Sequence, residues 1–203
     1  MGTVFQTNPI NPQKRHILRV VEALAEGRLI SYPTDSTYAI GCDLHNRRAV
    51  EKVYDLRKRD RKKPVSIIGP DIQTLSQYAV ISNSSFRILR RFLPGPYTFI
   101  LPGTPLVPKV MLTPRKTVGV RIPDVRIVLD IVAALGRPLS STSAILDDGT
   151  LLNDASEIER IFRGLIDIVI EGDCPGRPSS IVDLTEDEPQ IVRVGLGDVN
   201  WLA

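Results

Sequence analysis

The sequence predicts a single α/β domain built on a twisted, mixed sheet with flanking helices. Short apolar runs of strand length alternate with amphipathic helical segments along the whole chain. The 203 residues, 42% of them hydrophobic, suffice for one buried core and need no second domain. No internal repeat or linker interrupts the alternation. We therefore expect one domain over residues 1–203, with its core at about 12–195.

The first predicted helix begins at Asn11 and Pro12, residues that suit an N-cap and the first helical position. Apolar residues then recur at helical spacing: Ile17, Val20, Val21 and Leu24. Gly27 suits the end of this helix.

The next stretch, residues 29–43, is the one around which the chain is organised. Its apolar start, Leu29 and Ile30, predicts a buried strand that ends at Pro33, since proline has no N–H to give to a sheet. The small polar residues 34–37 follow, and a second strand begins near Ala39. Hydroxyls at a strand end suit a small polar ligand, but they also suit a local turn in which they bond only their own backbone.

Later elements follow from capping residues, periodicity and turns. Helices are predicted after Asn46, from Asp71, at 83–92, at 125–135 and at 155–162. Strands are predicted at 65–68, 97–101, 118–122, 166–170, 180–184 and 190–194, and the polar run 140–143 could be a strand edge. The proline-rich and basic segment 104–116 is expected to be a loop.

Composition indicates a cytoplasmic protein with an anionic partner. No run of eighteen apolar residues predicts a membrane helix, and the N-terminus does not resemble a signal peptide. Cys42 and Cys174 are expected to be reduced thiols. Net charge is +3, yet residues 57–63 read RKRDRKK, which suits a nucleotide or RNA and also suits a solvated surface.

Several chemistries are not expected. His16 and His45 have no cysteine or histidine at ligand spacing, so neither a structural metal site nor a Ser–His–Asp nucleophile is predicted. The phosphate-binding loop pattern G-x-x-x-x-G-K-[ST] does not occur. Asp147 and Asp148 precede a glycine and are interpreted as a solvated turn. The hydroxyl clusters at strand ends remain as candidates for a binding site. The alternative is that they are only polar strand edges or turn caps.

Six segments occur in an order that resembles the YrdC-like family, which includes threonylcarbamoyl-AMP synthases. They are YPTDSTYAIG, RKRDRKKP, PGPYTFIL, VGVRIP, STSA and PSSIVDL. The NPQ start and the closing RVGLGDV are most similar to the YciO-like branch. The resemblance implies a twisted sheet with a basic concave face. It also implies a cavity for ATP with Mg²⁺, L-threonine and bicarbonate, and a place in N6-threonylcarbamoyladenosine modification of tRNA.

The resemblance carries over to particular residues. It implies an ATP and phosphate site formed by Arg57, Arg59, Lys63, Ser143 and Arg193. It implies a threonine or small-molecule pocket formed by Thr34, Ser141, Arg121, Ser179 and Ser180. RNA binding attributed to the family would use Arg57, Lys58, Arg59, Arg61 and Lys62. No residue is assigned as general acid or base, and Mg²⁺ is expected to arrive with ATP.

Two positions depart from the synthase pattern. Arg57 stands where the synthases have lysine, and Ile145 stands where they have the asparagine of a Ser-x-Asn motif. The first keeps the charge, whereas the second replaces a polar group and predicts attenuated activity. The competing hypotheses are a non-catalytic module that binds double-stranded RNA or tRNA, and a nucleotide-dependent enzyme with another acyl acceptor.

Overall fold

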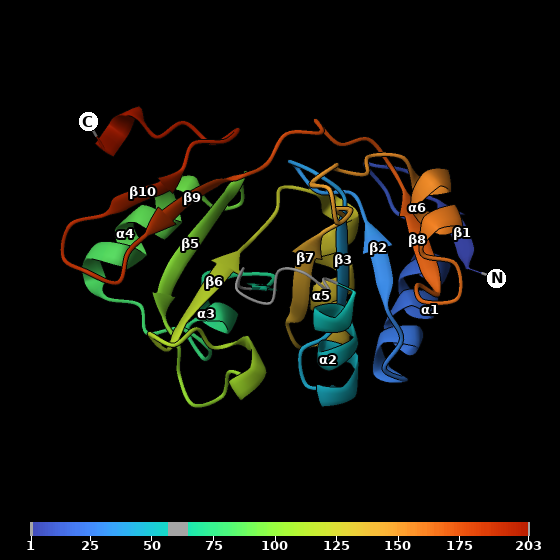
Figure 1. Ribbon diagram of the computed structural model, residues 1–203, viewed down its shortest axis with the longest axis horizontal. Helices are drawn as coiled ribbons and strands as arrows, with labels where there is room; N and C mark the ends of the chain where they lie inside the picture. The colour runs from blue at the N-terminus through green and yellow to red at the C-terminus, as the bar shows by residue number, and fades with distance from the viewer. Residues whose placement is uncertain (1, 57–64, 203) are drawn as a thin grey trace.

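The part of the chain that the structure describes forms one curved sheet of ten strands whose neighbours run in both parallel and antiparallel directions (Figure 1). The computed structural model describes residues 2–56 and 65–202. The strands lie in the order β1-β8-β2-β3-β7-β4-β6-β5-β9-β10. Their bounds are β1 Thr3–Gln6, β2 Ile30–Tyr32, β3 Ala39–Asp43, β4 Ser66–Ile68, β5 Tyr97–Pro102, β6 Thr117–Arg121, β7 Leu139–Ser143, β8 Ile168–Glu171, β9 Ser180–Asp183 and β10 Gln190–Arg193. The predicted mixed α/β sheet is confirmed.

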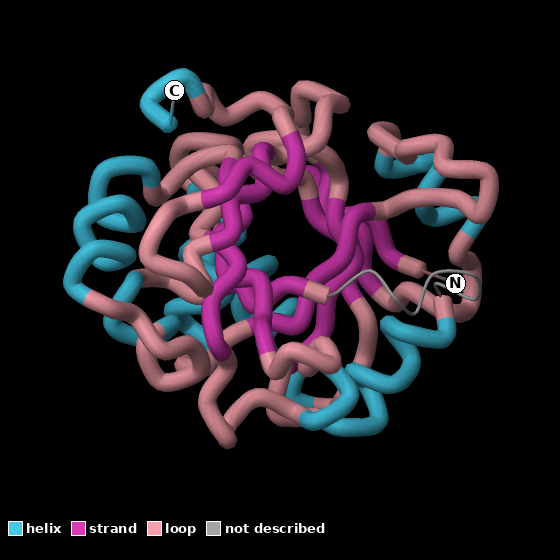
Figure 2. Tube along the Cα trace, turned by 60° about the vertical axis from the view of Figure 1, so that its left-hand side comes forward, coloured by secondary structure: helices cyan, strands magenta, loops and turns pink. Residues whose placement is uncertain are grey.

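Helices pack on both faces of this sheet. They are α1 Lys14–Ala25, α2 Arg47–Asp55, α3 Ile72–Leu75, α4 Asn83–Phe92, α5 Arg126–Leu135 and α6 Ala155–Ile161, with short 3-10 turns at Lys109–Met111 and Asn200–Leu202. The strands bend around a common axis, so the sheet has a concave and a convex face (Figure 2). None of the helices in the described part of the chain is long and apolar enough to cross a membrane.

Two hydrophobic cores correspond to the two faces. One core joins α1 and α5 to side chains of β2, β3 and β7, including Ile30, Tyr32 and Leu139. The other core contains residues of α2, α4 and α6, such as Val53, Leu89 and Ile158. Successive side chains of a strand point to opposite faces, so β3, whose residues are all buried, contributes to both cores.

Side-chain caps fix where several helices begin. Asn46, Asp71, Ser82 and Asp154 each accept a hydrogen bond from the backbone N–H three residues later. Asn11 was predicted to cap the first helix, and this is wrong because the helix begins at Lys14. The Asn8 side chain accepts the N–H groups of Ile10 and Asn11 at 2.9 and 2.8 Å, so Asn11 belongs to a preceding turn.

The N-terminal strand β1 was not predicted. It is an edge strand that pairs in parallel with β8, and Phe5 is its one buried residue. A segment with a single buried side chain lacks the alternation by which a strand is recognised. Its position is decided by β8, a partner more than 160 residues away in sequence.

Candidate functional site

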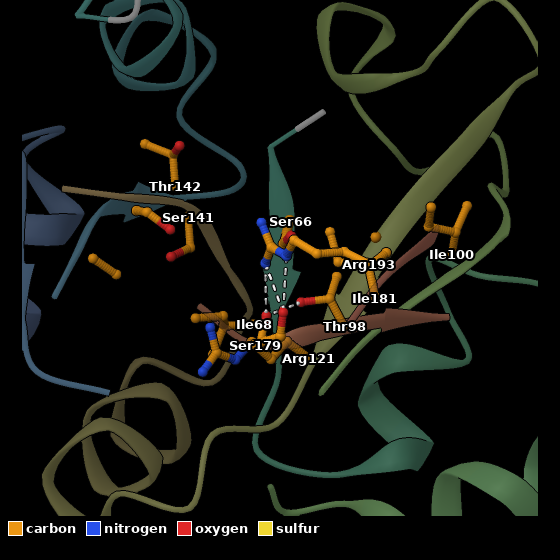
Figure 3. Close-up of a pocket in the computed structure, with 13 residues that line it drawn as sticks. Ser66, Ile68, Thr98, Ile100, Arg121, Ser141, Thr142, Ser179, Ile181 and Arg193 are labelled. Carbon is orange, nitrogen blue, oxygen red and sulfur yellow. Dashed lines mark hydrogen bonds between the residues drawn. The ribbon is translucent and has the colours of Figure 1, made fainter. Parts of the chain in front are cut away.

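A small pocket opens on the face of the sheet that α5 also covers (Figure 3). Its volume is about 160 Å³, and its lining comes from β3, β4, β5, β6, β7, β9 and β10 and from Ser179 just before β9. Ala39 and Ile68 belong both to this lining and to the core beneath α1 and α5. The pocket is therefore continuous with the rigid packing of the domain.

The hollow exists because small residues lie side by side across three strands. Ser141 of β7 is paired with Ser66 of β4, which is paired with Gly119 of β6. A Cβ atom on Gly119 would stand 3.1 Å from Ser66 Oγ and 3.2 Å from Thr98 Cγ2. Larger residues in this row would fill the space in which a ligand could lie.

Arg121, at the end of β6, is the central charged group of the pocket. Its residue is only 8% exposed, and its Nη2 atom donates to Ser36 Oγ at 2.6 Å and to Thr34 Oγ1 at 3.2 Å. The same nitrogen forms a very short ion pair with Asp35. Its Nε–H is buried and has no hydrogen-bond partner within residues 2–56 and 65–202. The loop after β2 thus holds the guanidinium through Nη2, while the Nε–H stays unpaired among the described residues.

Thr34 acts through Arg121 and does not line the pocket. Its hydroxyl donates to Thr37 O at 2.6 Å and accepts the N–H groups of Ser36 and Thr37, both at 3.2 Å. A hydroxyl has one proton, and that proton is committed to the turn. The turn predicted for these hydroxyls is present, but they do not bond only their own backbone, because Thr34 and Ser36 also accept hydrogen bonds from Arg121.

Asp35 is the ionic partner of Arg121, and the sequence analysis did not single it out. Its second carboxylate oxygen accepts the N–H of Asp124 at 2.9 Å, next to the start of α5. Asp35 stands between Thr34 and Ser36 in the stretch that the sequence already singled out. A carboxylate among hydroxyls was the available signal, because a buried cation elsewhere in the fold requires such a partner.

A second arginine approaches the same pocket from β10. Arg193 donates through Nε and Nη2 to Ser179 O at 3.0 and 2.8 Å, and the Ser179 and Thr98 hydroxyls lie 3.1 Å apart (Figure 3). Burial lowers the pKa of Arg193, and the positive charge of Arg121 lowers it further. The positive charges of Arg121 and Arg193 therefore repel one another across the pocket.

The predicted serines divide into two groups. Ser141, Ser143 and Ser179 line the pocket. Ser180 does not, because its hydroxyl donates to Gly197 O at 2.5 Å and accepts the Gly195 N–H at 2.9 Å. Its role in the structure is to hold the segment after β10 against β9.

Ile145 is not among the residues that line this pocket, and the expectation that it borders a ligand stays a prediction. Its backbone bridges to Leu151 beyond the end of β7, and its side chain faces a separate hollow that Leu29 and Phe162 also line. The alternation that brings Ser141 and Ser143 to the pocket ends with the strand at Ser143.

The basic run lies outside the described residues, and with it the predicted Arg57, Lys58, Arg59, Arg61, Lys62 and Lys63. In sequence, the pocket residue Ser66 follows Lys63 by three positions. Within residues 2–56 and 65–202, no group of three or more His, Cys, Asp and Glu side chains could hold a metal ion. Cys42 is a buried free thiol, and Cys174 is a free thiol of intermediate exposure.

These features define a class: an α/β protein with a strongly curved mixed sheet whose inner face carries a small pocket with two arginines and several hydroxyls. The profile of the Sua5/YciO/YrdC family, described as telomere recombination, matches residues 22–195. The chain belongs to this family.

Individual relatives agree with that assignment. YciO of Escherichia coli is 38% identical over 202 residues, 98% of each chain, and its crystal structure has a TM-score of 0.95. A threonylcarbamoyl-AMP synthase of Vibrio vulnificus is 30% identical over 185 residues, covering 89% of this chain and 98% of that one. The crystal structure of Pyrococcus abyssi Sua5 complexed with L-threonine has a TM-score of 0.88 at 27% identity, covering 95% of this chain and 57% of that one.

Proposed function

We propose that this chain binds L-threonine in the pocket and forms threonylcarbamoyl-AMP from L-threonine, bicarbonate and ATP. The threonine amino group would form a C–N bond to the carbon of bicarbonate with loss of water. A carbamate oxygen would then attack the α-phosphorus of ATP and displace pyrophosphate. The product would serve the N6-threonylcarbamoyladenosine modification of tRNA, as in the synthases that the chain resembles.

The convergence of Arg121 and Arg193 on one small pocket carries this proposal. Arg121 is largely buried, its Nε–H lacks a partner in the described part of the chain, and its charge lowers the pKa of Arg193. Asp35 neutralises only one of the two cations. A bound carboxylate would accept the unpaired Nε–H of Arg121 and relieve the repulsion, and guanidinium groups match carboxylate geometry well.

The size and walls of the pocket favour a small amino acid. Its 160 Å³ is less than the roughly 300–1,000 Å³ typical of sites for drug-sized ligands. The hydroxyls of Ser141 and Ser143 offer hydrogen bonds, while Ile100 and Ile181 provide apolar surface on the other side. Threonine has a carboxylate for the arginines, a hydroxyl for a serine and a methyl group for the isoleucines.

The triphosphate belongs elsewhere in this proposal. We place it on the basic run, through Arg57, Arg59 and Lys63, with Ser143 and Arg193 at its border with threonine. Mg²⁺ would enter as part of the ATP complex, bound to phosphate oxygens. No histidine or carboxylate is among the residues that line the described pocket. The contribution of the protein would then be positioning and neutralisation of charge.

Titration calorimetry with L-threonine tests the pocket directly. Arg193→Gln removes a partly exposed cation and Arg121→Gln a buried one. Each should weaken binding about tenfold to a hundredfold, because hydrogen bonds to charged groups contribute about 1.5–3 kcal/mol. Arg137→Gln is the matched control, since Arg137 also pairs with a buried carboxylate, Asp43, at 2.6 Å but does not line the pocket.

The control should lose stability and keep its threonine affinity within a factor of two. Unchanged affinity in both pocket variants would remove threonine from this site. The RNA-binding module remains the alternative proposal, and it depends on the basic run alone.

A further inference from the structure

Beneath the pocket, the phenol of Tyr32 reaches across the sheet to Ser141. Tyr32 lies on β2 and Ser141 on β7, with β3 between them. The Tyr32 hydroxyl donates to Ser141 Oγ at 2.7 Å, and Tyr32 is fully buried. Burial raises the pKa of this phenol well above its usual value, so it remains a proton donor at every physiological pH.

The structure makes specific room for this contact. Gly41 lies on β3 between the two residues, and a Cβ atom there would stand 2.9 Å from the Tyr32 hydroxyl oxygen. Any larger residue at position 41 would push the ring off its line to Ser141. The space for the tyrosine hydroxyl therefore depends on a glycine in the intervening strand.

The hydrogen bond determines what Ser141 can do. A serine hydroxyl carries one proton and accepts through its lone pairs. Tyr32 occupies an accepting position, and no acceptor for the Ser141 proton is found within residues 2–56 and 65–202. Ser141 is 5% exposed and lines the pocket, so the pocket is where its remaining hydrogen-bonding capacity is directed.

We infer that Tyr32 is a positioning residue that fixes Ser141 as a hydrogen-bond donor to an oxygen atom of the ligand. The inference rests on the proposed function, because it concerns the ligand of the same pocket. It adds a selection rule: the ligand presents an acceptor oxygen at Ser141, and a protonated amine is disfavoured there. L-Threonine would place a carboxylate or hydroxyl oxygen at this point and its ammonium group elsewhere.

The size of the effect follows from the rotamers of a hydroxyl. Without Tyr32, the Ser141 O–H can occupy about three staggered positions, of which one points to the ligand. If only that third of molecules is competent, the apparent affinity falls about threefold. Removing the donor itself by Ser141→Ala should cost about tenfold or more.

The test is a double-mutant cycle of Tyr32→Phe and Ser141→Ala on the full chain, with L-threonine affinity and thermal stability both measured. Tyr32→Phe should weaken binding about threefold in the wild-type background and not at all in the Ser141→Ala background. Tyr38→Phe is the matched control. It removes another buried hydroxyl, one that donates to Gly172 O at 2.8 Å outside this pocket. It should lower stability and leave affinity unchanged.

The outcomes distinguish the positioning role of Tyr32 from threonine binding by the pocket. A wild type that binds L-threonine while Tyr32→Phe binds equally well overturns the positioning role and leaves the proposed function standing. Equal affinity losses from Tyr32→Phe with and without Ser141 would also overturn it, because the effect would then not act through Ser141. A wild type that shows no threonine binding at millimolar concentration refutes the proposed function itself.

Discussion

Replacing Asp35 by asparagine should change stability and ligand affinity in opposite directions. The substitution keeps the shape of the side chain and an acceptor for the Asp124 N–H, but it removes the negative partner of Arg121. The two side chains are only 11% and 10% exposed. Breaking a buried pair by removing one partner costs about 3–5 kcal/mol, and we expect about 3 kcal/mol because the pair borders an open pocket.

The affinity for L-threonine should rise in the same variant. In the wild type, the Asp35 carboxylate repels a bound carboxylate on the other side of Arg121. At a separation of roughly 6 Å and an effective dielectric constant of about 20, that repulsion approaches 3 kcal/mol, and solvent in the pocket reduces it. A gain of about 1 kcal/mol, or fivefold in affinity, is the expected result. Thr34 and Ser36 still hold the guanidinium in place.

Urea unfolding with and without L-threonine, together with calorimetry, measures both effects. Asp43→Asn is the control, since it removes the carboxylate that pairs with Arg137 outside the pocket. Arg137 is 35% exposed, so the control should lose less stability, and its threonine affinity should not change. An Asp35→Asn variant that is as stable as the wild type, or that binds threonine more weakly, would contradict the assigned role of the Asp35–Arg121 pair.

Three further predictions concern other parts of the chain. Alanine at both Arg57 and Arg59 should weaken binding of ATP or of duplex RNA. The salt dependence of RNA binding should become less steep, because fewer counterions are released. If neither ATP nor RNA affinity changes in titrations, the basic run 57–63 is only a solvated surface. Ile145→Asn should leave threonine affinity within a factor of two, because Ile145 faces another hollow, and a large gain in calorimetry would contradict that placement. Burial raises the pKa of the Cys42 thiol to about 12. Since the folded pKa lies above the unfolded value near 9, the free energy of unfolding should fall as pH rises from about 9 to 12, by up to roughly 1.4 kcal/mol per pH unit. Cys42→Ala should flatten this slope, whereas an identical slope in the variant would show that Cys42 is not its source.

Much of the pocket was predictable because strand periodicity and polar residues coincide there. Ser141 and Ser143 stand two residues apart on β7, so they share a face, and both line the pocket. Arg121 stands at the end of an apolar strand and also lines the pocket. Such patterns identify the face and the strand end, which are local properties.

The direction of hydrogen bonds was not predictable in the same way. The sequence places Thr34 beside the pocket, but it cannot show that the hydroxyl proton goes to Thr37 O. Ser179 and Ser180 are neighbours with opposite outcomes, because the segment 195–197 returns to accept and donate at Ser180 alone. These contacts depend on segments that meet only after the chain has folded.

The sequence also does not show on which face a side chain lies once its strand has ended. A repeat of two places Ile145 on the same face as Ser143, but β7 stops at Ser143 and the chain turns to pair Ile145 with Leu151. The strand β1 was not predicted, and the first helix was predicted to begin too early, for a related reason. Both depend on partners, β8 and Asn8, whose position the local pattern does not contain.

Pyrophosphate release by the purified full chain tests whether the chain forms threonylcarbamoyl-AMP. With ATP and Mg²⁺ present, release should require both L-threonine and bicarbonate. One pyrophosphate should be released for each threonylcarbamoyl-AMP formed, as measured by mass spectrometry. Arg121→Gln should reduce it at least tenfold while Arg137→Gln retains it. Pyrophosphate release that does not depend on threonine, or no release at any threonine concentration, would contradict the assignment of this pocket to threonylcarbamoyl-AMP synthesis.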